Sequence, residues 1–290
     1  MLLLMLKHKM DKSELLSKYR NIFVEVENNN LGLSPRKLGQ LSNKLHNELL
    51  LETAENIYIQ EKRVEPLFLN YYCYVISMIE SRHKIIPYTD IEFSRRIGEV
   101  WERFCNLILK NPFSSAEILK EPENSEFFQK LNSDIDNLSS NSKPKKINEL
   151  KNLISSLVGN IDLKLDYFGK SEETIYGIDF KSGFGSNEKG NTERILQVGN
   201  AYRYLEPATN LNVLVRQNEN NNYMNKIENS GIWNVKKGKE AYLFLEDLSK
   251  CSVIEILENE FAFEEDFDSK VYEDIGKTVN NREKYLNWYQ

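Results

Sequence analysis

The stretch Gly159–Gly185, GNIDLKLDYFGKSEETIYGIDFKSGFG, contains two segments in which apolar and polar residues alternate. They cover residues 161–168 and 174–182, and a period of two is the pattern of a half-buried β-strand. The residues between them, GKSEE, are typical of a turn. We therefore predict a β-hairpin whose turn is centred near Lys170 and Ser171.

The second predicted strand carries an acid and a lysine two residues apart, Asp179 and Lys181. Alternation puts both side chains on one face of the strand, about 7 Å apart along it. Phe180 points to the other face, into the core, and its carbonyl stays available to a metal ion. Mg²⁺ prefers carboxylate, carbonyl and water oxygens. It activates water and stabilises charge in phosphodiester hydrolysis, so a site with a second acid on the neighbouring strand suits this reaction.

The first predicted strand offers two candidates for that second acid, Asp162 and Asp166. With the turn near Lys170, residue 162 falls opposite residue 179 or 180. Asp166 then lies about 13 Å nearer the turn. This geometry favours Asp162, whereas a tighter or bulged hairpin favours Asp166.

The residues after the hairpin predict further elements of an α/β domain. A Gly-rich loop is followed by an amphipathic helix over 192–205 and by a strand over 211–217. Residues 241–248, AYLFLEDL, form either another strand or the start of a helix.

The residues before the hairpin are expected to be mainly helical. Three helices are predicted over 33–59, 64–86 and 90–110, and a short helix over 146–158 leads into the hairpin. The polar stretch 112–147 is expected to be an excursion or loop. We predict a helical N-terminal region at 1–90, a core at 91–250 and a C-terminal extension at 251–290.

Composition limits the classes of protein. The formal net charge of −6 argues against tight non-specific binding to nucleic acid through whole-molecule charge, but it permits a local basic cleft. The cysteines, Cys73, Cys105 and Cys251, form no CxxC pair and fit a reducing cytoplasm. Neither they nor the three histidines have the spacing of zinc ligands. No segment is long and apolar enough to predict a membrane span.

The hairpin residues and their surroundings resemble the PD-(D/E)XK nuclease superfamily, which includes type II restriction endonucleases and the RecB and Cas4 nucleases. Asp162 in GNID matches the first motif acid, although Asn160 and Ile161 replace the usual preceding proline pattern. Asp179 and Lys181 in GIDFKSG match the second motif. The resemblance covers about residues 95–245 and is most like a type II restriction endonuclease.

The resemblance implies a restriction-endonuclease-like mixed sheet flanked by helices, and Mg²⁺-dependent, sequence-specific cleavage of double-stranded DNA. Asp162, Asp179 and the carbonyl of Phe180 are expected to hold Mg²⁺, while Lys181 positions or activates water. The pattern Gly98-xxx-Glu102 resembles the first core helix of this fold and makes Glu102 an accessory acid, with Glu99 as second choice. Cleavage would leave a 5′-phosphate and a 3′-hydroxyl. A homodimer and a cognate DNA methyltransferase are the expected partners.

Several downstream residues are candidates for DNA contacts or support of the site. Glycine lets a backbone approach a ligand closely. Arg194 and Gln197 share a helix face, and RecB-like nucleases carry a Gln followed by a Tyr on this helix; here Tyr202 follows Gln197 by five residues rather than four. The candidates are Gly183, Lys189, Asn191, Arg194 and Gln197.

Two alternatives stay open. One is a RecB- or Cas4-like repair or processing nuclease, although the chain lacks the cysteine cluster of Cas4. The other is a non-catalytic DNA-binding protein on the same fold, against which the intact Asp…Asp-x-Lys set argues.

Overall fold

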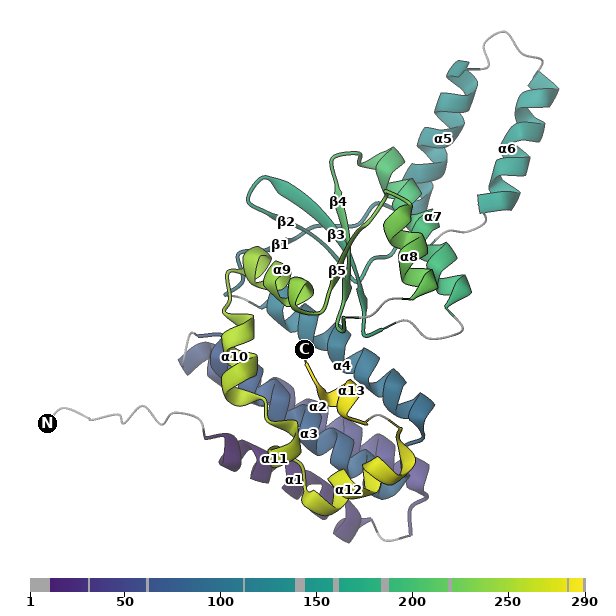
Figure 1. Cartoon of the computed structure of the whole chain (residues 1–290). Coiled ribbons are helices and arrows are strands. Elements are labelled where there is room, and N and C mark those ends of the chain that lie inside the picture. The colour runs from purple at the N-terminus through teal and green to yellow at the C-terminus, as the bar shows by residue number, and fades with distance from the viewer. Residues whose placement is uncertain are drawn as a thin grey trace, which may run out of the picture. The chain divides into compact units, whose positions relative to one another are not determined.

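The computed structural model describes residues 11–30, 32–60, 63–111, 113–138, 144–158, 162–183, 188–218, 221–280 and 282–288, with the side chains of 156–158 excepted. The chain divides into two compact units (Figure 1). Of the residues described, a helical unit contains those within 11–107, 111–113 and 251–288, and an α/β unit contains those within 108–110 and 114–250.

The α/β unit contains a five-stranded mixed open sheet in the order β1-β2-β3-β4-β5. Strands β1 to β3 are antiparallel, and β3, β4 and β5 run parallel. The elements are β1 (Glu117–Ile118), α5 (Asn124–Leu138), α6 (Pro144–Val158), β2 (Tyr167–Ser171), β3 (Thr174–Lys181), α7 (Lys189–Leu205), β4 (Asn210–Val215), α8 (Asn222–Asn229), β5 (Asn234–Lys237) and α9 (Lys239–Ser249).

Helices cover both faces of this sheet (Figure 1). On one face, Ile195 and Val198 of α7 and Met224 of α8 join Val213 and Val215 of β4 in the core of the unit. On the other face lies α9, whose Phe244 contacts Tyr176 of β3 with ring centroids 5.8 Å apart. The predicted α/β class is confirmed.

The predicted hairpin forms, but its turn lies at Glu172 and Glu173 instead of Lys170 and Ser171. Glu172 has a φ of 54°, as two-residue hairpin turns require. Gly169, which suggested an earlier turn, lies inside β2 next to β1. A Cβ there would come within 2.3 Å of the Glu117 carbonyl oxygen, so this glycine permits close strand approach and does not mark a turn.

One other prediction needs correction, and one open alternative is decided. The stretch 112–147 was expected to be an excursion or loop, but it contains β1, α5 and the start of α6; α5 and α6 form a helical pair in which Lys151 contacts Asp136 at 2.7 Å. Residues 241–248, for which a strand and a helix start were both open, lie in helix α9. There Ala241, Tyr242, Leu245 and Leu248 are buried at helical spacing, which decides between the two periodicities.

The helical unit contains both ends of the described chain. Its elements are α1 (Lys12–Asn29), α2 (Pro35–Gln60), α3 (Glu65–Ile85), most of α4 (Asp90–Lys110), α10 (Val253–Glu260), α11 (Phe263–Asp266), α12 (Ser269–Thr278) and α13 (Arg282–Leu286). Helix α3 is buried along most of its length, as its apolar sequence predicts. Among the residues of the described ranges, no helix is long and apolar enough to cross a bilayer.

The C-terminal segment, predicted as an extension at 251–290, is part of this helical unit. Glu80 of α3, 2% exposed, pairs with Arg20 of α1 at 2.6 Å and accepts the backbone N–H of Asp268 at 2.7 Å. Trp288 packs against Phe104 with ring centroids 4.9 Å apart. The unit boundary also lies near residue 114, instead of the expected residue 91, because most of α4 belongs to the helical unit.

Candidate active site

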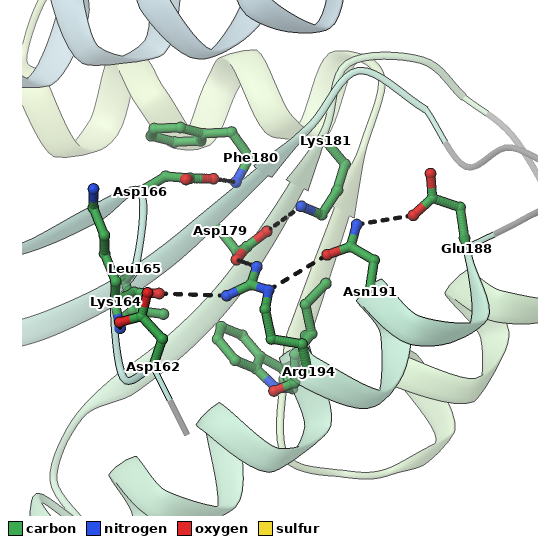
Figure 2. A network of polar contacts seen from close by, with 12 residues as sticks. Asp162, Lys164, Leu165, Asp166, Asp179, Phe180, Lys181, Glu188, Asn191 and Arg194 are labelled. Atoms are coloured by element: carbon green, nitrogen blue, oxygen red, sulfur yellow. Dashed lines mark hydrogen bonds and ion pairs between the residues drawn. The ribbon is translucent and has the colours of Figure 1, made fainter. Parts of the chain in front are cut away.

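The candidate site lies at the C-terminal end of β3, on the sheet face covered by α7 (Figure 2). Asp179 and Lys181 stand in register with Val213 and Val215 of β4, so they share the face of these core residues. The Asp179 residue is only 1% exposed. Its Oδ1 lies 2.6 Å from the Lys181 Nζ, so the predicted same-face geometry of the pair is confirmed.

Arg194 of α7 holds the other oxygen of the same carboxylate. Its Nη2 lies 2.6 Å from Asp179 Oδ2, and its side chain is 38% exposed. The guanidinium also makes two longer contacts, at 3.4 Å to the Lys164 carbonyl and at 3.5 Å to Asn191 Oδ1. Asn191 in turn donates to the Glu188 carboxylate at 2.8 Å, as Figure 2 shows. The buried carboxylate therefore lies between two cations.

The observed hairpin register changes the choice of the first acid. The last pair of the β2–β3 ladder is Tyr167 with Ile178, so this register brings Asp166, one residue before β2, and not Asp162, towards Asp179. Asp166 is half-buried, and its Oδ2 accepts the backbone N–H of Phe180 at 2.6 Å. The preference for Asp162 rested on a turn two residues too early, and that reasoning was wrong.

Asp162 itself is exposed. Its Oδ1 accepts the backbone N–H of Lys164 at 3.2 Å, a local contact of the kind that aspartate makes in turns. The segment from residue 162 to residue 166 was predicted as strand, but it precedes β2 and has no ladder partner among the described strands.

Phe180 is placed as predicted, with a buried side chain on the face opposite Asp179. In an antiparallel pair, the N–H and C=O of one residue point to the same neighbour. Because the Phe180 N–H reaches Asp166 on the β2 side, the Phe180 carbonyl faces that side too, beyond the last paired residue of the ladder. This carbonyl and the two carboxylates therefore surround the same end of β3.

The remaining predicted residues divide into two groups. Glu99 and Glu102 belong to the helical unit and are exposed on α4, where Glu99 pairs with Arg96 at 2.5 Å. Gly183, Lys189 and Gln197 lie in the α/β unit; Lys189 and Gln197 are exposed and make no contact with the Asp179 network among the residues described. The roles of all five stay predictions.

Sequence reasoning missed two residues next to this network. Glu121, in the connection after β1, accepts the backbone N–H of Leu165 at 2.8 Å. Burial is the main cause of the raised pKa of Tyr202 on α7, and the negative charge of Glu121 is the second cause. Arg216 is 1% exposed, and its backbone N–H donates to the Lys181 carbonyl at 2.8 Å. A charged residue directly after the apolar strand 211–215 was the available signal for Arg216; Glu121 had none, because its contact spans 44 residues.

The donor set at this end of β3 suits a hard divalent cation, on one condition. Asp179, Asp166 and the Phe180 carbonyl are oxygen ligands of the type that Mg²⁺ takes. In the arrangement seen, however, Arg194 and Lys181 occupy both Asp179 oxygens, and the described residues contain no ready cluster of three or more acidic, histidine or cysteine ligands. Binding of a cation by Asp179 would therefore require Arg194 to leave Oδ2.

A carboxylate that is 1% exposed needs a cationic partner, since an unpaired buried charge is costly.

Comparison of the chain with protein-family models, with curated proteins and with solved structures finds no match.

Proposed function

We propose that this protein is a magnesium-dependent nuclease that hydrolyses phosphodiester bonds of double-stranded DNA, with Asp179, Lys181 and Asp166 at its centre. The observation that carries the proposal is the buried Asp179 carboxylate. It has the Lys181 ammonium 2.6 Å away, and Asp166 accepts the backbone N–H of the adjacent Phe180 at 2.6 Å. An acid, a lysine and a second acid at one strand end are the groups that this hydrolysis needs.

Each residue has a definite part in the proposal. Asp179, Asp166 and the Phe180 carbonyl would hold Mg²⁺, with Asp166 replacing Asp162 as first acid. Bound Mg²⁺ would stabilise charge at phosphorus and lower the pKa of a coordinated water. Lys181, 14% exposed, positions the attacking water. The water oxygen bonds to phosphorus while the bond to the 3′-oxygen breaks, which leaves a 5′-phosphate and a 3′-hydroxyl.

The edge of the sheet beside this site is basic, which supports DNA as the substrate. Strands β3, β4 and β5 are parallel, so their C-terminal ends share one edge. Lys181, Lys236, Lys237 and Lys239 lie at that edge. Lys237 pairs with Glu228 at 3.4 Å, whereas the half-buried Lys236 has no ion pair within the described ranges. Contacts between lysines and phosphates contribute most of the affinity of DNA-binding proteins.

Within this chemistry we propose the type II restriction class, on the resemblance of GNID and GIDFKSG to that group. Such an enzyme acts as a homodimer beside a cognate methyltransferase. A RecB- or Cas4-like processing nuclease is the second candidate. The three cysteines are free and buried at separate positions, which disfavours the Cas4 type.

The test is cleavage of closed circular and linear DNA with Mg²⁺ or with EDTA. A restriction enzyme gives discrete fragments, a processing exonuclease degrades ends and spares closed circles, and a binding protein shifts DNA without cutting it. Lys181→Met should abolish cleavage. Lys170→Met is the matched control, because Lys170 lies near the hairpin turn and contacts Glu173 at 3.4 Å. Equal cleavage by Lys181→Met and the parent would contradict the proposed centre.

A further inference from the structure

The contacts of Arg194 differ in strength. Its contact with Asp179 is short, at 2.6 Å, but its other two contacts are 3.4 and 3.5 Å long, near or beyond the limit of a useful hydrogen bond. The side chain is also 38% exposed, against 14% for Lys181. Arg194 is therefore held at the site mainly by Asp179, and it has open solvent into which it can withdraw.

The two cations on Asp179 are thus not equivalent. Lys181 comes from the same strand, two residues away, and its side chain is largely enclosed. Arg194 comes from α7, fifteen residues further along the chain. It is the partner that an incoming cation can displace with the smaller rearrangement.

From this we infer that Arg194 is a positioning residue that occupies the metal side of Asp179 in the metal-free protein and is exchanged for the divalent cation. The inference rests on the proposed metal-dependent function and adds a device to it. The guanidinium keeps the buried carboxylate neutralised and correctly oriented while no metal is bound. It also lowers the apparent affinity for the metal, because each cation must compete with an ion pair.

Release of Arg194 also gives it a second use. A guanidinium presents a planar fork of donors that matches phosphate as well as carboxylate. With Asp179 held by a divalent cation, Arg194 would be free to pair with a DNA phosphate. The metal and the substrate then favour the same displaced position of the side chain.

The experiment is a titration of the full-length protein with Mn²⁺, in which free Mn²⁺ is measured by electron paramagnetic resonance without DNA. Arg194→Met should bind Mn²⁺ about fivefold more tightly than the parent, the size of a partly exposed ion pair. Arg194→Lys should fall between the two. Arg203→Met is the matched control, because it removes the same charge from the same helix; Arg203 donates instead to the Gly231 carbonyl. Its Mn²⁺ affinity should equal that of the parent.

A purely structural role for Arg194 predicts the opposite sign, since loss of a supporting contact would disorder Asp179 and weaken Mn²⁺ binding. Unchanged or weaker binding by Arg194→Met therefore overturns the inference, while Asp179-dependent binding by the parent leaves the proposed nuclease standing. If neither protein binds Mn²⁺ in a manner that Asp179→Asn abolishes, the metal site itself is contradicted. In the unsubstituted protein, the NMR signal of the Arg194 Nε–H group should shift on addition of Mg²⁺; no shift at saturation also refutes the exchange.

Discussion

Substitution of Asp166 provides the sharpest test of the site, because the hairpin register and the proposed chemistry both depend on it. Its Oδ2 accepts the Phe180 N–H at 2.6 Å, one position beyond the last ladder pair. Asp166→Ala leaves that N–H without its acceptor. The loss of a charge-assisted hydrogen bond at a half-buried site costs about 1.5–2 kcal/mol of unfolding free energy. Asp162→Ala removes an exposed, local contact of 3.2 Å and should cost no more than about 0.5 kcal/mol.

Asparagine separates the structural effect from the chemical one. Asp166→Asn keeps an oxygen that accepts the Phe180 N–H, so stability should fall by less than about 1 kcal/mol. It removes a charged metal ligand, however, and cleavage should fall about 100-fold or more, equivalent to about 3 kcal/mol of transition-state stabilisation. Asp162→Asn should retain most of the activity of the parent.

Two measurements check this prediction. Urea unfolding gives the change in stability, and hydrogen exchange of the Phe180 amide gives the local effect, which should be about tenfold faster in Asp166→Ala. Plasmid cleavage with Mg²⁺ gives the activity. If Asp162→Asn stops cleavage while Asp166→Asn cuts like the parent, the register argument is refuted and Asp162 is the first acid after all.

Three further predictions test other parts of the molecule. In Ca²⁺, the double variant Lys236→Gln/Lys239→Gln should lower the dependence of log K for DNA on log salt concentration by about 2, whereas Lys170→Gln, near the hairpin turn, should leave it unchanged. His46 is fully buried, and burial lowers its pKa, so the unfolded state, whose histidine gains a proton below about pH 6.5, takes up that proton at a higher pH than the folded state does. Urea unfolding should show a contribution to stability that is complete above that pH and falls as the pH drops below it, with a flatter profile in His46→Gln. Trp288→Ala should destabilise the helical unit by about 3 kcal/mol in denaturant unfolding, because Trp288 is 7% exposed and packs on Phe104; a loss near zero would contradict the inclusion of the C-terminal segment in that unit.

The features that the sequence predicted correctly are local ones. Alternation along 174–181 places Asp179 and Lys181 on one face, and this depends only on the period of a strand. The helical spacing over 192–205 and 64–86 likewise predicts α7 and α3, because propensity and periodicity act within a few turns of the chain.

The features that needed the tertiary structure depend on contacts between distant residues. Gly169 suggests a turn in the sequence, but in the structure it lies inside β2 beside β1, and the turn lies at Glu172 and Glu173. Moving the turn by two residues changes the position expected opposite Asp179 by four, from Asp162 to Asp166. The reason is that the numbers of paired residues in a hairpin add up to twice the number at the centre of the turn.

The partner of Asp179 on α7 was equally beyond the sequence. A helix face contains several polar residues at suitable spacing, and only the packing of α7 on β3 decides that Arg194 reaches the carboxylate while Gln197 stays in solvent. The chain alone determined that an acid and a lysine share a strand end. Long-range packing decided which acid and which cation complete the set, since register and helix placement are set by contacts that no local pattern encodes.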